Sequence, residues 1–197
     1  NCAPASAIFA IWMSSDNWRC GDRAASGSSM MYRPFPLYSS KKDKKLLFDS
    51  RLAWNFVEES FKVFLSVSLP VAASRVLGDT SRGEVESYKS IEECMASLKD
   101  RAATEDRRYK DIYGIEYFNY ANYNLVLDSS DCTPDVLAKI LVDEAVAAEE
   151  KKAKGEKIGT KLILDKNRPE EDFAKEKAQG KVSLQTVCGV EFLVIEL

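Results

Sequence analysis

A short apolar strand followed at once by a capped helix constrains the fold of this chain more than any other sequence feature. The strand is Asn124–Asp128, and the helix begins with Thr133 as N-cap and Pro134 at its first position. Side chains such as Thr satisfy free backbone N–H groups at a helix start, and proline is favoured just inside it. A buried strand that feeds a capped helix is one unit of an α/β sheet. The stretch 101–141 therefore predicts an α/β fold.

Charged residues on the helix before this strand repeat at helical spacing. Arg101, Glu105 and Arg108 are four and three residues apart, which places them on one face of the helix. Arginine binds phosphate well because its planar guanidinium donates two hydrogen bonds at once. In open α/β sheets, ligands bind at the carboxyl ends of the strands. Spacing alone favours a different interpretation, an exposed ladder of salt bridges worth about a few tenths of a kcal/mol per pair.

Composition excludes several classes of protein. The 197 residues carry a net charge of -3 with a pI near 5.3, so no global basic field attracts duplex nucleic acid. No apolar run approaches the roughly 20 residues of a membrane helix. Histidine is absent, which removes Ser-His-Asp and Cys-His catalysis and histidine metal sites. The five cysteines form no C-x-x-C pair, so we expect reduced thiols, no metal site and a cytoplasmic protein.

The order of the motifs resembles the cytidylate kinase family of P-loop nucleoside monophosphate kinases, in its archaeal-like and clostridial-like branch. The resemblance covers about residues 46–142 and rests on DSRLA at 49–53 and on RxxxExxR at 101–108, followed by YGI at 113–115. It implies a three-layer parallel sheet of the P-loop kinase type with extra C-terminal strands. The implied reaction is phosphoryl transfer from ATP, with Mg²⁺, to CMP or dCMP.

The resemblance assigns the acceptor site to four residues. Arg51 matches the arginine that contacts the acceptor phosphate, and Arg101, Glu105 and Arg108 match the set that binds the nucleoside monophosphate. Glu105 stands where the family commonly has an aspartate. We expect the guanidinium groups to converge on one cleft at the strands' carboxyl ends, with Glu105 beside them as counter-charge. Such a site should hold phosphate, sulfate or a nucleoside monophosphate, with an affinity that falls as salt rises.

The catalytic residues that the resemblance implies lie elsewhere. Arg75 and Arg82 match the lid arginines that surround the transferring phosphoryl group, and Asp49 matches a magnesium-positioning acid at the end of its strand. Phosphoryl transfer needs mainly positioned positive charge, not a covalent nucleophile.

One family motif is absent from these 197 residues. P-loop kinases cradle phosphates with G-x-x-x-x-G-K-[ST], whereas the single Gly-Lys pair here, Gly180-Lys181, is followed by Val182. Two functions therefore stay open. The first is a cytidylate-kinase-like enzyme that uses ATP and Mg²⁺. The second is a non-catalytic nucleotide-binding or assembly module without a cofactor. The chain begins with Asn1 and not Met, as a processed or partial product would.

The chain divides into three parts. Residues 1–45 are an unaligned segment, residues 46–146 a kinase-like α/β core, and residues 147–197 a charged helix extension with C-terminal strands that leave room for a protein partner. In P-loop kinases, the strand that leads into the phosphate loop lies in the middle of the sheet. Without a strand in that position, backbone N–H and C=O groups of its neighbours would be unpaired in the core. We therefore expect Ala7–Met13 to take this position, with Phe192–Glu196 as the alternative.

Three strands and their apolar residues define the expected core. Leu46–Asp49, Phe61–Val67 and Asn124–Asp128 should be neighbouring parallel strands with helices on both faces, because each is short and apolar with a helical crossover between them. The predicted core residues are Leu47, Phe48, Val63, Phe64, Leu65, Leu125, Val126 and Leu127.

Overall fold

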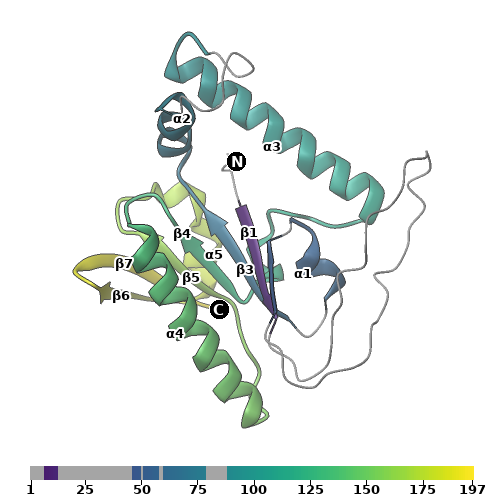
Figure 1. Ribbon diagram of the computed structural model, residues 1–197, viewed down its shortest axis with the longest axis vertical. Helices are drawn as coiled ribbons and strands as arrows, with labels where there is room; N and C mark the ends of the chain where they lie inside the picture. Colours follow the sequence, from purple (N-terminus) through teal and green to yellow (C-terminus); the bar gives the residue numbers. More distant parts are fainter. Residues whose placement is uncertain (1–6, 13–45, 50, 58–59, 79–87) are drawn as a thin grey trace.

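A computed structural model gives the arrangement of the chain (Figure 1). It describes residues 7–12, 46–49, 51–57, 60–78 and 88–197, with side chains from residue 51 onward. The described strands form one mixed sheet in the order β2-β1-β3-β4-β5-β7-β6. Their bounds are β1 Ala7–Trp12, β2 Leu46–Asp49, β3 Ser60–Ser66, β4 Leu125–Asp128, β5 Lys161–Asp165, β6 Lys181–Val187 and β7 Val190–Glu196.

Helices of very different length connect these strands. The α-helices are α1 Ala53–Phe56, α2 Leu69–Gly78, α3 Ile91–Tyr113, α4 Pro134–Ala153 and α5 Ala174–Gln179, and the 3₁₀ turns are η2 Tyr120–Asn122 and η3 Glu170–Asp172. The long helix α3 begins where Ser90 Oγ accepts a hydrogen bond from Glu93 N, 3.2 Å away. It ends at Gly114, whose φ of 70° is a left-handed conformation that suits glycine.

Part of the expected strand order is wrong. β3 and β4 are parallel neighbours, with Val63 paired to Leu125, as predicted. β2 does not touch β3, because β1 lies between them and pairs antiparallel with both. The sheet is therefore mixed and not wholly parallel, and β4, not β1, holds the middle of the order. An apolar run predicts that a segment enters a sheet, but parallel and antiparallel ladders both satisfy its backbone, so direction does not follow.

The carboxyl-terminal strands extend the sheet beyond β5. β7, which contains the predicted segment Phe192–Glu196, pairs antiparallel with β5, and β6 pairs antiparallel with β7 as the outer strand. The sequence did not predict β6. Six of its seven residues are exposed, so it lacks the alternation of buried and exposed positions that marks a half-buried strand.

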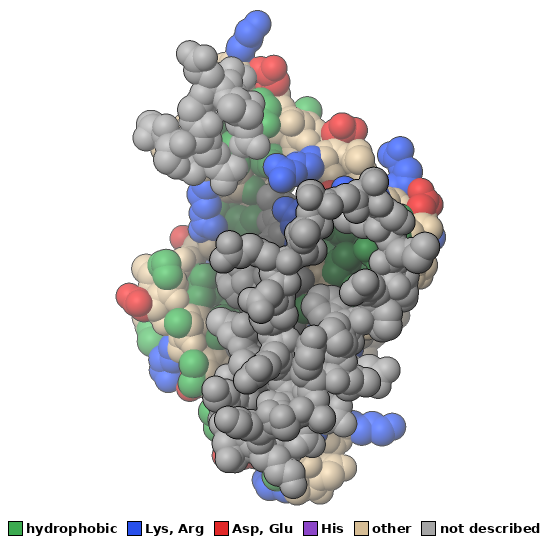
Figure 2. Space-filling view, turned by 45° about the vertical axis from the view of Figure 1, so that its right-hand side comes forward, with side chains coloured by type: hydrophobic (Ala, Val, Ile, Leu, Met, Phe, Trp, Pro, Cys, Tyr) green, Lys and Arg blue, Asp and Glu red, His purple; other side chains and the backbone are tan. Residues whose placement is uncertain are grey.

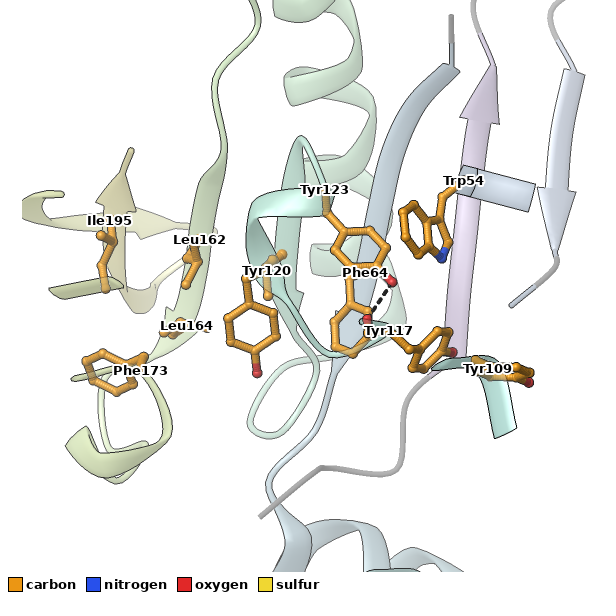
Figure 3. Packing of buried hydrophobic residues seen from close by; sticks show 11 residues of the cluster. Trp54, Phe64, Tyr109, Tyr117, Tyr120, Tyr123, Leu162, Leu164, Phe173 and Ile195 are labelled. Carbon is orange, nitrogen blue, oxygen red and sulfur yellow. Dashed lines mark hydrogen bonds between the residues drawn. The ribbon is translucent and has the colours of Figure 1, made fainter. Parts of the chain in front are cut away.

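Two layers cover the faces of the sheet. Alternate residues of the central strands point to opposite sides, so Phe64 and Val126 belong to one apolar cluster and Val63 and Leu125 to another. Helix α4 covers the second face, where Val136 and Ile140 pack. The first face is covered mainly by aromatic residues of segment 109–123, with α1 beside them (Figure 3).

The predicted core is confirmed where side chains are described. Val63, Phe64, Leu125, Val126 and Leu127 have no exposed surface. The side chain of Leu65 is partly buried against the second cluster, whereas the side chains of Leu47 and Phe48 lie outside the described residues.

Helices α2 and α3 pack together and complete the fold. Ala72 and Ala73 of α2 pack against Cys94 and Leu98 of α3. From there α3 runs across to α1 (Figure 1), where the rings of Phe56 and Tyr113 lie 5.7 Å apart. The carboxyl-terminal half of α3 is thus held close to the segment that follows β2. Within the described part of the chain, no helix has the length and apolar character of a membrane span.

Candidate functional site

Two arginines from distant parts of the chain share one carboxylate. Arg51, just after β2, donates a hydrogen bond from Nη1 to Oε1 of Glu105 in α3 and forms an ion pair with it. The Nε atom of Arg101, one turn earlier in α3, lies 3.8 Å from the same oxygen. These three residues form the arginine–glutamate cluster. The helical spacing anticipated the contact between Arg101 and Glu105, and the fold adds Arg51.

The arginine–glutamate cluster lies at a partly open surface. The side chains of Arg51 and Arg101 are 43% and 55% exposed, and that of Glu105 is 21% exposed. Partial burial opposes the charge of Arg51, but the Glu105 carboxylate and side-chain hydrogen bonds to Tyr109 and Glu105 outweigh it, so the pKa of Arg51 is raised. Two guanidinium groups thus face one carboxylate at this surface. Lys and Arg side chains gather along the upper part of the face in Figure 2.

Arg108 lies on the same helix but makes a different contact. Its guanidinium carbon lies 5.3 Å from the centre of the Tyr109 ring, within the range of a cation–π contact. Convergence of Arg108 with Arg51 and Arg101 on one ligand stays a prediction.

The predicted catalytic residues lie outside this cluster. Arg75 in α2 donates from Nη2 to the backbone oxygens of Ser129, at 2.6 Å, and Ser130, at 3.3 Å. It thereby holds the loop between β4 and α4, at the carboxyl end of a central strand. Arg82 and the side chain of Asp49 lie outside the described residues. The catalytic roles of all three stay predictions.

An aromatic cluster adjoins the arginine–glutamate cluster through Tyr109. Its members are Trp54, Phe64, Tyr109, Tyr117, Tyr120 and Tyr123 (Figure 3). The rings of Tyr109 and Tyr117 are 5.1 Å apart, as are those of Trp54 and Tyr123. Tyr123 donates from its hydroxyl to the backbone oxygen of Tyr117 at 2.8 Å. Tyr109 links the two clusters, since it contacts Tyr117 and also interacts with Arg51.

A second charged group, not predicted from the sequence, lies at the carboxyl ends of the central strands. Arg168 donates from Nη1 to Oδ2 of Asp128 at 2.8 Å and to Oγ of Ser66 at 2.7 Å. The Arg168 and Asp128 side chains are 2% and 0% exposed. Nothing in the sequence marked Arg168, which lies in a charged segment that resembles a solvated loop.

The surroundings of Arg168 do not suit a phosphate. A pocket of about 540 Å³ beside it is lined by Lys99 but also by Asp131, Asp165, Glu171 and Asp172. The charge of Arg168 is already neutralised by Asp128. An anion therefore fits the arginine–glutamate cluster better than this pocket.

The described residues also offer no protein-held metal site. They contain no group of three Asp, Glu or Cys side chains placed to hold an ion. Asp128, the most buried acid, is occupied by Arg168 and by Ser130, whose N–H lies 2.9 Å from Oδ1. Among the described residues, none therefore forms a site that fits a resident Mg²⁺.

Comparison with known proteins finds one matching family and several relatives. The sequence profile described as the cytidylate kinase-like family matches residues 12–131, more than half of the chain. A cytidylate kinase of Methanothrix thermoacetophila is 34% identical over 42% of this chain and 44% of its own length. A cytidylate kinase of Methanobrevibacter smithii is 30% identical over 52% of this chain and 56% of its own length.

A third relative carries a different name. An S-adenosylmethionine-dependent nucleotide dehydratase of Lacinutrix mariniflava is 31% identical over 55% of this chain and 21% of its own length. The chain thus spans between a fifth and about half of the length of these curated relatives. No solved structure matches the chain.

Proposed function

Because the chain belongs to the cytidylate kinase-like family, we propose that it binds CMP or dCMP and transfers a phosphoryl group to it from ATP. One observation carries the proposal. Arg51 and Arg101 converge on the Glu105 carboxylate at a half-exposed site, where the family resemblance puts the acceptor phosphate. A phosphate dianion can replace Glu105 as the partner of these arginines, because guanidinium groups bind phosphate through paired hydrogen bonds.

Each residue of the cluster then has a separate task. Arg51 and Arg101 hold the phosphate and orient it for attack on ATP. The Glu105 carboxylate, released from Arg51, accepts a hydrogen bond from the nucleoside and offsets the mutual repulsion of the two arginines. Arg108 adds a third positive group at the same end of α3. Positioned charge of this kind is the main protein contribution to phosphoryl transfer.

The donor side of the reaction rests on the family resemblance. Arg75 and Arg82 are proposed as the groups that neutralise the transferring phosphoryl, and Asp49 as the acid that faces the magnesium of a Mg²⁺·ATP substrate. The contacts of Arg75 with Ser129 and Ser130 put it at the carboxyl end of β4, the edge of the sheet where open α/β folds bind ligands.

A second candidate function is a nucleotide-binding module without phosphoryl transfer. Two observations favour it. None of the 197 residues forms the G-x-x-x-x-G-K-[ST] phosphate cradle. The match to a nucleotide dehydratase covers more than half of this chain, so a kinase-like segment also occurs in a protein that is named for a different activity.

A turnover assay separates the two functions. Incubated with Mg²⁺·ATP and CMP or dCMP, the kinase should form ADP together with CDP or dCDP in equal amounts, measured by anion-exchange chromatography. Arg101→Met should lower kcat/KM for CMP at least about tenfold, since a hydrogen bond to a charged group contributes about 1.5–3 kcal/mol.

The matched control is Arg107→Met, because Arg107 is an exposed arginine of the same helix outside the cluster. CMP binding without CDP formation would support the module instead. Neither binding nor turnover with either monophosphate would contradict both functions.

A further inference from the structure

Strand β6 leaves one edge of the sheet open. It is the last strand of the order, and β7 is the only described strand that pairs with it. Figure 1 shows β6 on the opposite side of the sheet from β1 and α1. Six of its seven residues are exposed, among them Leu184 at 70% and Val182 at 40%. Backbone N–H and C=O groups along such an edge can pair with a further strand.

The hairpin between β6 and β7 decides which residues present these backbone groups. The two strands are joined by Cys188 and Gly189, whose φ angles are both positive, 50° and 80°, as in a type I′ turn. The two residues that flank such a turn exchange both backbone hydrogen bonds, and every second pair along the ladder does the same. The residues of β6 whose N–H and C=O groups face the free edge are therefore Val182, Leu184 and Thr186.

A hydrogen bond on the other side of β7 agrees with this assignment. Leu197, just after β7, donates from its backbone N to the backbone oxygen of Thr160 at 2.9 Å, on the side of β5. Adjacent residues of a strand turn their backbone groups to opposite sides, so Glu196 faces β6, where Lys181 is its partner. Lys181 thus points its backbone groups inward, and Val182 points them outward.

The outward-facing residues are symmetric about Leu184. When two copies of β6 lie antiparallel and centred on this residue, Leu184 is opposite its own counterpart and Val182 is opposite Thr186. Each outward N–H then meets an outward C=O of the other copy. A contact of this kind uses the same surface on both subunits, so it closes at two copies and does not grow into a fibre.

The side chains of β6 fit the same register. Leu184 and Val182 lie beside Leu193 and Ile195 of β7, which belong to the first apolar face of the sheet. Pairing of two copies would place the exposed Leu184 side chains against each other and continue this apolar face from one copy into the next. On the other face, Ser183 of one copy would lie opposite Gln185 of the other, and these side chains can hydrogen-bond.

Strand β6 lacks the features that keep edge strands apart. Natural proteins protect such edges with charged side chains, proline or bulges. Lys181, at the first position, is the only charged residue of β6, and the strand contains no proline. Its register with β7 runs without a bulge from Lys181 to Val187. A strand of another protein could use the same backbone groups, but the symmetry about Leu184 favours a second copy of this chain.

We propose that β6 pairs antiparallel with β6 of a second copy of this chain, about a two-fold axis at Leu184, so that one sheet runs through a dimer. A single pair of strands makes a small interface, so the dimer should form reversibly at micromolar concentrations. Arg51 follows β2, which lies at the other end of the strand order. The pairing therefore does not depend on nucleotide binding at the arginine–glutamate cluster.

Sedimentation velocity of the full chain at increasing concentration tests this pairing. The wild type should shift from monomer to dimer. Leu184→Lys and Leu184→Glu should each weaken self-association at least about tenfold, because like charges would face each other at the axis. The Leu184 side chain is mostly exposed in the single chain, so both variants should keep the circular dichroism spectrum of the wild type. The matched control is Ile112→Lys, which changes an apolar residue of α3 that is 56% exposed and should dimerise like the wild type.

Mixing the two charged variants tests the register itself. An equimolar mixture of Leu184→Lys and Leu184→Glu should recover dimers, because opposite charges meet only if residue 184 faces its counterpart. A wild type that stays monomeric, assemblies larger than a dimer, unchanged association of Leu184→Lys, or a mixture that associates no better than either variant alone would each overturn the proposal. CMP binding is measured separately, so the failure of this pairing would leave the proposed function intact.

Discussion

Replacing Arg168 with methionine should destabilise the protein by about 3–5 kcal/mol, the usual effect of removing one partner of a buried ion pair. The change leaves the Asp128 carboxylate, which is 0% exposed, without its guanidinium. It also removes the donor to Ser66 Oγ and the ion pair with Asp172 at 3.1 Å. Burial opposes the charge of Arg168, but Asp128 outweighs it, so the pKa of Arg168 is raised.

Urea unfolding of three variants measures this effect. Among the three variants, Arg168→Met alone should show the largest loss of unfolding free energy. Adding Asp128→Asn should restore part of this loss, because the double variant no longer buries an uncompensated charge. The exposed control, Arg107→Met, should change the free energy of unfolding by less than about 0.5 kcal/mol. Equal stability of Arg168→Met and the wild type would show that this ion pair does not hold the strand ends together.

Phe64→Ala should cost about 3–5 kcal/mol of stability, the range for deleting a buried phenylalanine ring. Phe64 has no exposed surface and lies at the centre of the aromatic cluster. Its ring centroid is 5.0 Å from that of Tyr123, 5.6 Å from Tyr120 and 6.1 Å from Tyr117. The vacated volume is walled by large rigid rings, so it cannot close by small shifts.

Chemical denaturation with two reference variants checks this prediction. Phe64→Leu keeps much of the volume and should lose clearly less stability than Phe64→Ala. Leu184→Ala removes a side chain of β6 in a residue that is 70% exposed and should change stability little. Similar losses for Phe64→Ala and Leu184→Ala would mean that the aromatic cluster does not stabilise the fold.

The sequence predicted the elements of this fold better than their arrangement. The strand at 125–128, its parallel pairing with β3 and the start of α4 at Pro134 follow from apolar runs and cap residues whose effects are local. The position and direction of β1 in the sheet do not follow from such local signals, because they depend on which strand edges are free once the rest of the sheet has formed. Strand β6 escaped prediction because an exposed edge strand has no buried side to mark it.

The candidate site divides in the same way. Helical spacing was enough to put Arg101 and Glu105 together. The contact of Arg51 with Glu105 joins residues 54 positions apart, and only the family resemblance pointed to it. The pairing of Arg168 with Asp128 across 40 positions had no local or family signal, since neither residue lies in a pattern that predicts a buried ion pair.

A calorimetric titration of CMP into the wild type and into Arg51→Met, Arg101→Met and Arg107→Met tests the central claim most directly. The arginine–glutamate cluster predicts binding to the wild type that weakens as salt rises. It also predicts a loss of about 1.5–3 kcal/mol in either Arg51→Met or Arg101→Met, and no loss in Arg107→Met. No heat with the wild type, or equal affinity in all four proteins, would contradict a nucleotide site at Arg51, Arg101 and Glu105.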